Sequence, residues 1–270
     1  MSIKLENLVL ASPEQMSFII QGLRNPFNSH NKSDSFECTV AECDICERFI
    51  DNGGCPNLDS GFHLGYNDRS LMYRLAKAGT DHRKFMRMMP VYIRITAPLY
   101  WWKEFDTYKV GTVSNSCSTM HKMHAKYFTI EDFSTDQLST IVGEDIKLLD
   151  EYKDDDLQYY KHRVDLSDTI RELNLMRHLY LAATEKTKAN NLSEADRKYT
   201  DAQKKKFWLM MIQLLPSSYN QTRNVMMNYE VLANIYWSRK DHKLYEWREF
   251  CKWIEELPHS ELICRNSNED

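Results

Sequence analysis

The chain has 270 residues, of which 42% are hydrophobic and 27% charged, so it contains ample material for a hydrophobic core. No stretch approaches the ~18 consecutive apolar residues that a membrane helix needs, and the N-terminus lacks a basic segment followed by an apolar one. We therefore expect a cytoplasmic protein with no membrane partner. The net charge of −4 gives no overall electrostatic reason to bind nucleic acid.

Glycine is scarce, with only eight residues, whereas aromatic residues reach 12%. Neither the G-x-G-x-x-G nor the G-x-x-x-x-G-K-[ST] phosphate-binding pattern occurs. These absences argue against a Rossmann dehydrogenase or a P-loop NTPase. Any nucleotide must be held mainly by side chains.

The first half of the chain alternates strand and helix signals around one long polar segment. We predict a strand over 3–10 and then a helix that begins at Ser12-Pro13 and ends near Leu23. An irregular excursion over 25–65 follows, and after it a helix capped by Asn67-Asp68 and closed by Gly79. A short helical segment over 82–88 leads into a strand over 91–96.

The second half is dominated by helical patterns. We predict a helix over 99–105, followed by a loop over 106–124. A charged helical region over 145–183, with a break at 166–168, is followed by a polar connection over 186–206. Apolar helices over 207–215 and 220–237 and an amphipathic helix over 244–257 complete the chain order. The resulting fold class is α+β, rich in helix, with a single domain.

Four cysteines fall within the polar excursion, as Cys38-x4-Cys43-x2-Cys46-x8-Cys55. Four thiolates can hold a tetrahedral zinc ion, and the central C-x2-C pair has the spacing of a zinc knuckle. The outer spacings match no common zinc finger. We therefore favour a cysteine-rich surface loop over a zinc site.

An aromatic helix over 99–105 leads directly into a segment rich in hydroxyl and amide side chains, which ends at His121. Such a segment offers many neutral donors and acceptors to a polar planar ligand. A loop that caps nearby helix ends would have the same composition, so both interpretations stay open.

The segment 228–240 places two amides and a cation in an apolar helix. On a continuous helix, Asn228 and Arg239 share a face because eleven residues correspond to about 20° of turn, whereas Asn234 lies off that face. An arginine at this position can bind an anion with two hydrogen bonds. A lone arginine at a helix C-terminus more often complements the helix dipole.

These two segments resemble the flavin-dependent thymidylate synthases, the ThyX family. The family motif R-H-R-x-x-S-x-N-x-x-S-x-R-Y follows a helix that begins at Ala-Pro. Here Ala97-Pro98 matches that start, and Glu104 stands where the family has a glutamine. Thr107-Tyr108-Lys109 falls on the Arg-His-Arg, and with one inserted residue Asn115 and Ser118 fall on the motif's Asn and second Ser.

The resemblance continues on both sides of the motif. Upstream, Gly79-Thr80-Asp81-His82 is similar to a Gly-His-Glu-Thr segment that contacts the flavin. Downstream, Asn228 and Asn234 fall on two flavin-contacting asparagines, and Glu230 stands where an arginine is usual. Arg239 falls on the arginine that binds and polarises the uracil ring.

The resemblance implies an α+β domain over 1–270 with a small mixed or antiparallel sheet, a cysteine-rich insert at about 25–65 and a charged helical insert at about 145–206. It implies a homotetramer that methylates dUMP reductively at C5, with methylenetetrahydrofolate as carbon donor and NADPH reducing bound FAD. Arg239 is then catalytic. The implied cofactor-binding residues are His82, Thr107, Tyr108, Lys109, Asn115, Asn228, Glu230 and Asn234, and the implied substrate-binding residues are Glu104, Ser116, Ser118 and Arg239.

Several arginines of the family are replaced in this chain. Thr107-Tyr108-Lys109 substitutes the Arg-His-Arg, Met120-His121 substitutes the closing Arg-Tyr, and Ile212 replaces a further arginine. These losses favour an alternative hypothesis, a ThyX-fold protein with altered or lost catalysis that binds a nucleotide or flavin or serves as an oligomeric scaffold. A third hypothesis, nucleic-acid binding through residues 186–206, is weaker because that run mixes both signs of charge.

Overall fold

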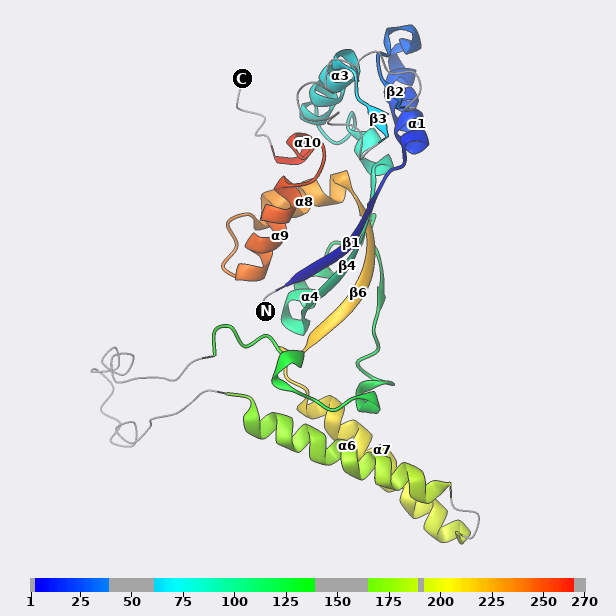
Figure 1. Cartoon of the computed structure of the whole chain (residues 1–270), viewed down its shortest axis with the longest axis vertical. Coiled ribbons are helices and arrows are strands. Elements are labelled where there is room, and N and C mark those ends of the chain that lie inside the picture. Colours follow the sequence, from blue (N-terminus) through cyan, green and yellow to red (C-terminus); the bar gives the residue numbers. More distant parts are fainter. Residues whose placement is uncertain (1–2, 39–60, 139–164, 189–191, 265–270) are drawn as a thin grey trace, which may run out of the picture. The chain divides into compact units, whose positions relative to one another are not determined.

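The computed structural model describes residues 3–38, 61–138, 165–188 and 192–264 (Figure 1). They fall into two compact units. The first unit comprises Met1–Lys4, Thr96–Trp102 and Ser116–Thr222, and the second comprises Leu5–Ile95, Lys103–Asn115 and Arg223–Asp270. Each unit is therefore assembled from segments that are distant in sequence. The predicted domain and insert boundaries remain predictions.

A small antiparallel sheet has the strand order β1-β4-β6-β5 (Figure 1). Its strands are β1 (Lys4–Leu10), β4 (Pro90–Pro98), β6 (Asn220–Asn228) and β5 (Val113–Ser116). Along β4, Val91, Ile93 and Ile95 are buried, whereas Tyr92 and Arg94 between them are exposed, which is the period of two expected of a strand. The predicted α+β class is confirmed.

The first helix of the second unit, α1 (Pro13–Arg24), begins as predicted. The Ser12 hydroxyl accepts a hydrogen bond from the Gln15 backbone N–H, and the Gln15 side chain accepts one from the Ser12 N–H. This reciprocal capping box satisfies two of the N–H groups that a helix start leaves without partners.

The polar excursion over 25–65 contains regular structure in its described parts. Two short 3-10 turns, η1 (Asn25–Phe27) and η2 (His30–Lys32), precede β2 (Phe36–Glu37), which pairs antiparallel with β3 (Phe62–His63). Of the proposed zinc ligands, Cys38 is described, whereas Cys43, Cys46 and Cys55 lie outside the described residues.

Helix α3 (Tyr66–Lys77) begins earlier than predicted. Gly65 is its N-cap, so the expectation that Asn67-Asp68 caps this helix is wrong. The N–H groups at the start of this helix are capped by the Asp34 side chain instead. Its two carboxylate oxygens accept hydrogen bonds from the N–H groups of Asn67 and Asp68, at 2.8 and 3.1 Å. Gly79, with φ +99°, follows the helix as predicted.

The Asp68 carboxylate is buried and joins α3 to α1. It pairs with Arg24, which is itself only 3% exposed. The second carboxylate oxygen accepts from the hydroxyls of Ser33 and Ser35, each at 2.7 Å. Burial raises the pKa of Asp68, but these hydrogen bonds outweigh it and hold the pKa below its usual value.

Asp68→Asn should lower the free energy of unfolding by about 3 kcal/mol, because it leaves the buried Arg24 guanidinium without its counter-charge. Urea denaturation measures this loss. Asp168→Asn is the control, since the Asp168 carboxylate is 85% exposed on another helix and its change should stay within about 0.5 kcal/mol. Equal effects of the two substitutions would contradict the buried network.

The C-terminal part of the second unit begins with a strand where the sequence predicted a helix. The segment 220–237, predicted as one helix, is strand β6 followed by helix α8 (Tyr229–Arg239), so that prediction is wrong. Helix α8 packs against the 3-10 turn η3 (Lys84–Met88), α9 (Tyr245–Glu255) and α10 (Glu261–Cys264). The predicted amphipathic helix is confirmed as α9, which buries Trp247, Phe250, Cys251 and Ile254.

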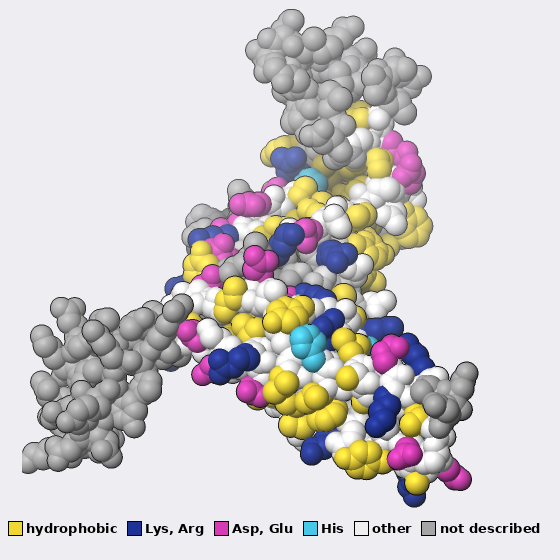
Figure 2. Space-filling model, turned by 60° about the horizontal axis from the view of Figure 1, so that its bottom comes forward, with side chains coloured by type: hydrophobic (Ala, Val, Ile, Leu, Met, Phe, Trp, Pro, Cys, Tyr) yellow, Lys and Arg dark blue, Asp and Glu magenta, His cyan; other side chains and the backbone are white. Residues whose placement is uncertain are grey.

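The first unit contains a helical hairpin of α6 (Ser167–Thr187) and α7 (Glu194–Leu214), which lie side by side (Figure 1). The expectation of a polar connection over 186–206 is wrong, because Ser193 caps α7 and its hydroxyl accepts from the Asp196 N–H. Figure 2 turns this end of the chain toward the viewer and shows hydrophobic side chains mixed with charges of both signs.

Helix α6 of the hairpin packs on the short element η4 (Met123–Ala125) of the same unit. The turn η5 (Ile130–Asp132) follows η4 in the chain. The core of the unit consists of Met123, Phe128, Phe133, Leu173, Met176 and Met211. Helix α4 (Leu99–Phe105) forms as predicted, but the predicted loop over 106–124 contains the short strand β5.

His259 precedes α10 in the left-handed region, with φ +59°. Burial lowers the pKa of its imidazole below the usual value. Below about pH 6.5 the unfolded chain therefore binds a proton that the folded chain does not, and the free energy of unfolding falls as pH decreases.

His259→Asn should flatten this dependence, because asparagine tolerates a positive φ and does not titrate. The slope removed should be at most about 1.4 kcal/mol per pH unit, and urea denaturation at about pH 5.5 and about pH 7.5 measures it. The exposed His178, changed to asparagine, is the control and should leave the slope as in the wild type. An unchanged slope in His259→Asn would contradict a lowered pKa of this imidazole in the folded chain.

Candidate functional site

Arg239 ends α8 and is held by groups from α4 and the turn that follows it. Its Nε donates to the Tyr108 hydroxyl at 2.9 Å, and its Nη1 donates to Glu104 Oε2 at 2.7 Å. The side chains of Arg239 and Glu104 are only 18% and 33% exposed. Two of the four residues that the resemblance assigns to substrate binding, Glu104 and Arg239, therefore form a half-buried ion pair.

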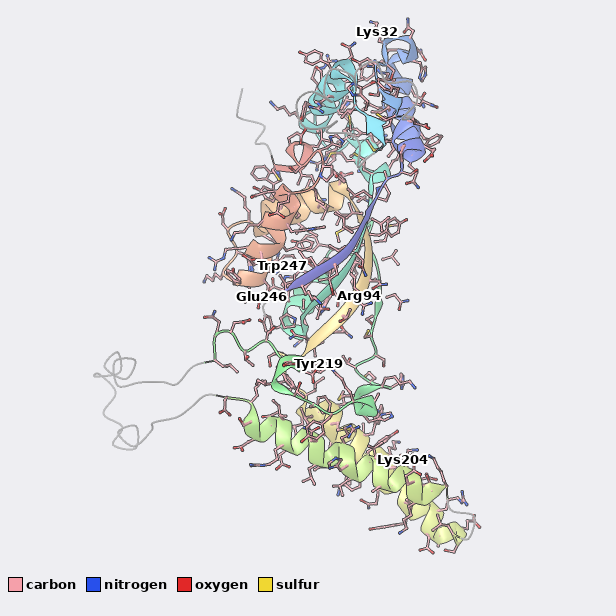
Figure 3. All side chains as sticks on the ribbon, in the orientation of Figure 1. Lys32, Arg94, Lys204, Tyr219, Glu246 and Trp247 are labelled. Carbon is pink, nitrogen blue, oxygen red and sulfur yellow. The ribbon has the colours of Figure 1, made fainter. Side chains whose placement is uncertain are left out.

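Trp247 completes this cluster from α9 (Figure 3). Its indole N–H donates to the same Glu104 Oε2 at 2.9 Å, and the Arg239 guanidinium lies 4.9 Å from the centre of its ring. His242 Nε2 lies 3.5 Å from Glu104 Oε2. A cation over an indole face is favourable, so Trp247 and Glu104 together fix where the guanidinium lies.

Asn228 is the N-cap of α8 and does not lie inside a helix, so the predicted continuous helical face that it shares with Arg239 is wrong. Its side-chain oxygen accepts from the Val231 N–H at 3.0 Å. Gly111 lies against this cap with φ +79°, and a Cβ atom there would come within 3.0 Å of Asn228 Nδ2. The backbone after α4 therefore approaches the start of α8 closely.

Glu230, expected to bind the cofactor, is 6% exposed and paired within the chain. It accepts from Arg87 and, at 3.3 Å, from Arg83 Nε, both on or beside η3. The Glu230 carboxylate raises the pKa of Arg87 above its usual value. This carboxylate thus anchors η3 to α8, and its charge is balanced without a ligand.

The remaining predicted cofactor-binding side chains of the second unit are mostly exposed. They are His82, Thr107, Lys109, Asn115 and Asn234. The Thr107 hydroxyl donates to the Glu104 carbonyl at 2.7 Å, which closes the turn after α4. The other side chains of this group present neutral and cationic groups at the surface of the unit.

Ser116 and Ser118, expected to bind substrate, belong to the first unit and are exposed. The Ser118 hydroxyl accepts from the N–H groups of Met120 and His121 at 3.3 and 2.8 Å. It thereby fixes the turn that follows β5. The Trp208 indole N–H donates to the Met120 carbonyl at 2.7 Å and holds the same turn on α7.

Three residues of the Arg239 and Glu230 clusters were not predicted from the sequence: Trp247, Arg83 and Arg87. Trp247 lies in the predicted amphipathic helix over 244–257, and Arg83 and Arg87 lie in the predicted helical segment over 82–88, where the sequence predicts no site residue other than His82. The two arginines are four positions apart at a 3-10 turn, in which residues i and i+3 share a face, so their spacing alone does not predict a common carboxylate partner. Within the described residues, no cluster able to hold a metal ion is found, and no helix is long and apolar enough to cross a membrane.

Comparison with known proteins identifies the fold. No protein-family model and no curated protein matches the sequence. Two solved structures of the flavin-dependent thymidylate synthase ThyX from Helicobacter pylori, both with FAD and dUMP, are similar to this chain. Each match covers 98% of this chain and 98% of the ThyX chain, with 15% sequence identity and a TM-score of 0.50. The chain has the ThyX fold. The resemblance found in the sequence is thus confirmed at the level of the fold.

Within the ThyX fold of this chain, the ion pair between Glu104 and Arg239 can be measured by a double-mutant cycle. Glu104→Gln and Arg239→Gln, alone and together, should show a coupling free energy of about 1 kcal/mol in urea denaturation. The exposed pair Glu185–Lys188, with both residues changed to glutamine, is the control and should give about 0.3 kcal/mol. Coupling no greater than in the control would contradict the half-buried ion pair.

Proposed function

We propose that this chain is a flavin-dependent thymidylate synthase, which methylates dUMP at C5 with methylenetetrahydrofolate as carbon donor and NADPH as reductant of bound FAD. The observation that carries the proposal is the fixed guanidinium of Arg239, held by Glu104, Tyr108 and Trp247 in a chain with the ThyX fold. Solved structures with that fold contain FAD and dUMP.

The exposed polar side chains of the second unit match the groups that a bound flavin requires. A flavin ring needs neutral donors and acceptors, which Asn115 and Asn234 offer, and its phosphates need cations such as Lys109. Gly111 lets the backbone approach Asn228 closely, because a Cβ atom at this position would come within 3.0 Å of Asn228 Nδ2. When bound, FAD supplies the hydride-transfer chemistry.

Glu230 is not part of the proposed flavin site. Its carboxylate is buried and balanced by Arg83 and Arg87, and an anion next to the flavin phosphates would repel them. We therefore assign Glu230 to positioning η3 against α8, and we retain His82, Thr107, Tyr108, Lys109, Asn115, Asn228 and Asn234 as the proposed cofactor residues.

Arg239 would stabilise negative charge that develops on a pyrimidine oxygen. Two of its five N–H groups donate to Tyr108 and Glu104 within the described residues, so three remain for a ligand. A guanidinium already held in place stabilises charge without reorganising during the reaction, which is the main source of electrostatic catalysis. Glu104 acts here as a positioning residue. Ser116 and Ser118 remain proposed substrate residues.

A ThyX-fold protein with altered or lost catalysis is the second candidate. It is favoured by the Glu104 carboxylate, which already neutralises Arg239, and by Ile212, which packs against the core of the first unit where the family has an arginine. Such a protein would bind a nucleotide or flavin or act as a scaffold. We propose a homotetramer in either case, which light scattering would test.

The purified protein should show flavin absorption after FAD is added, and it should release tritium from C5 of labelled dUMP when NADPH and methylenetetrahydrofolate are present. Arg239→Ala should lower kcat/KM for dUMP about 10- to 100-fold, the equivalent of one charge-assisted hydrogen bond. Arg248→Ala is the matched control, because Arg248 lies on α9 over the Tyr245 ring and outside the cluster.

The outcomes separate the two candidates. Flavin uptake with tritium release that depends on Arg239 supports the enzyme. Flavin or dUMP binding without tritium release supports the second candidate. A protein that binds neither ligand contradicts both.

A further inference from the structure

A small cavity with basic and aromatic walls lies on the helical hairpin of the first unit. It has a volume of about 280 Å³ and is lined by His121, Tyr180, Asp201, Lys204, Lys205 and Trp208. Four of these residues belong to α7 and follow the spacing i, i+3, i+4 and i+7, which keeps side chains on one face of a helix. The cavity is therefore built from one face of α7, from α6 and from the turn after β5.

Two aromatic rings in this cavity are held by contacts within the unit. The Trp208 indole N–H donates to the Met120 carbonyl at 2.7 Å, which holds this ring against the turn after β5. The Tyr180 ring packs on the His124 ring, with their centres 4.5 Å apart. Both Trp208 and Tyr180 are only half-buried, so part of each ring faces solvent. A partly exposed ring that is already held in place suits the stacking of a planar base.

Cations from three elements gather around these rings. Lys204 on α7 (Figure 3) places its ammonium group 5.6 Å from the centre of the Tyr180 ring. Arg177 on α6 donates from Nε to the His124 carbonyl at 3.0 Å. Burial lowers the pKa of His124, and the positive charges of Lys122, Arg177 and Lys204 lower it further. All three cations therefore lie near one imidazole.

One carboxylate on the cavity wall, that of Asp201, offsets part of this charge. It lies three and four positions before Lys204 and Lys205 on α7, where opposite charges attract weakly across the helix surface. Among the described residues that line the cavity, Asp201 is the only acidic one. Four cations, Lys122, Arg177, Lys204 and Lys205, stand against this single carboxylate. The surface is therefore positive although the whole chain carries a net charge of −4.

We propose that this surface binds single-stranded nucleic acid. One base would stack on Trp208 in the cavity, and the phosphates on either side of that base would lie over the four cations. Stacking rings flanked by cations hold single strands without reading their sequence. The proposal does not depend on the proposed reaction, because strand binding can be measured without dUMP, FAD or methyl transfer.

The size of the cavity and the placement of the cations favour a strand over a smaller anion. The volume of about 280 Å³ lies below the range of about 300–1,000 Å³ that is usual for sites enclosing a whole small molecule, but it accommodates one base. Lys122 and Arg177 do not line the cavity, so positive charge continues beyond the space that a mononucleotide would fill. A duplex is disfavoured because its bases are already stacked on one another.

Fluorescence anisotropy of the full chain with a labelled oligodeoxyadenylate of about 12 nucleotides tests the surface. At about 50 mM NaCl the dissociation constant should lie between about 1 and 100 µM, the range of binding that depends on phosphate contacts alone. Lys204→Gln and Lys205→Gln together should weaken binding at least about fivefold. They should also make the plot of log K against log salt shallower by about 1.4, since each lost phosphate contact removes about 0.7.

The matched control changes Lys186→Gln and Lys206→Gln, which removes the same charge from the same hairpin. Both side chains are exposed and neither lines the cavity, so affinity should change less than about twofold. Circular dichroism checks that both double variants keep the fold.

A second pair of variants tests the stacking. Trp208→Phe and Trp208→Leu both lose the hydrogen bond to Met120, so any effect on the turn is common to both and their difference reports the ring. Trp208→Phe should bind the oligonucleotide about fivefold more tightly than Trp208→Leu. Inorganic polyphosphate, which has no bases, should compete more weakly per phosphate than unlabelled oligodeoxyadenylate.

The proposal is overturned if the oligonucleotide does not bind, or if the Lys204/Lys205 variant and its control bind it equally. Equal binding by Trp208→Phe and Trp208→Leu, or equal competition by polyphosphate, would likewise overturn it, because the surface would then bind any polyanion. Failure of the proposed methylation with intact strand binding would leave this surface standing.

Discussion

One carboxylate oxygen, Glu104 Oε2, joins three segments of the second unit, which are the end of α4, the end of α8 and helix α9. It accepts hydrogen bonds from Arg239 at the end of α8 and from Trp247 on α9, and its own residue lies near the end of α4. A half-buried carboxylate with two donors is strongly constrained, because moving any one helix leaves a charge or an N–H group without its partner. The position of the guanidinium therefore follows from helix packing.

Local sequence signals predicted the elements whose ends or periodicity are unambiguous. Ser12 as N-cap, followed by Pro13 and Glu14, predicted the start of α1. The helical spacing of Trp247, Phe250 and Ile254 predicted α9. Strand β6 was missed because its alternation is carried partly by Gln221, a polar residue that is nevertheless buried, so hydrophobicity alone did not show a period of two. The neighbouring strands decide the conformation of this segment, and a single sequence does not reveal them.

Part of the candidate site could likewise be predicted from the sequence, and part depends on the fold. Motif positions placed Glu104 and Arg239 together as substrate residues, and the structure does bring them into contact. Their pairing with Trp247 depends on how α9 folds back on α4 and α8, which spacing along the chain does not encode. Similarly, Glu230 was a departure from a motif in the sequence, and only the fold shows that Arg83 and Arg87 balance its charge.

Strand β5 lies at an edge of the sheet, and all four of its residues are exposed. Few buried contacts oppose its detachment, so this edge should open at a much smaller free energy than the central strands β4 and β6. Asn115, a proposed ligand-contacting residue, lies on this strand. A ligand that orders the edge loses part of its affinity to conformational entropy, and hydrogen exchange at these amides would slow on binding even where the core is unchanged.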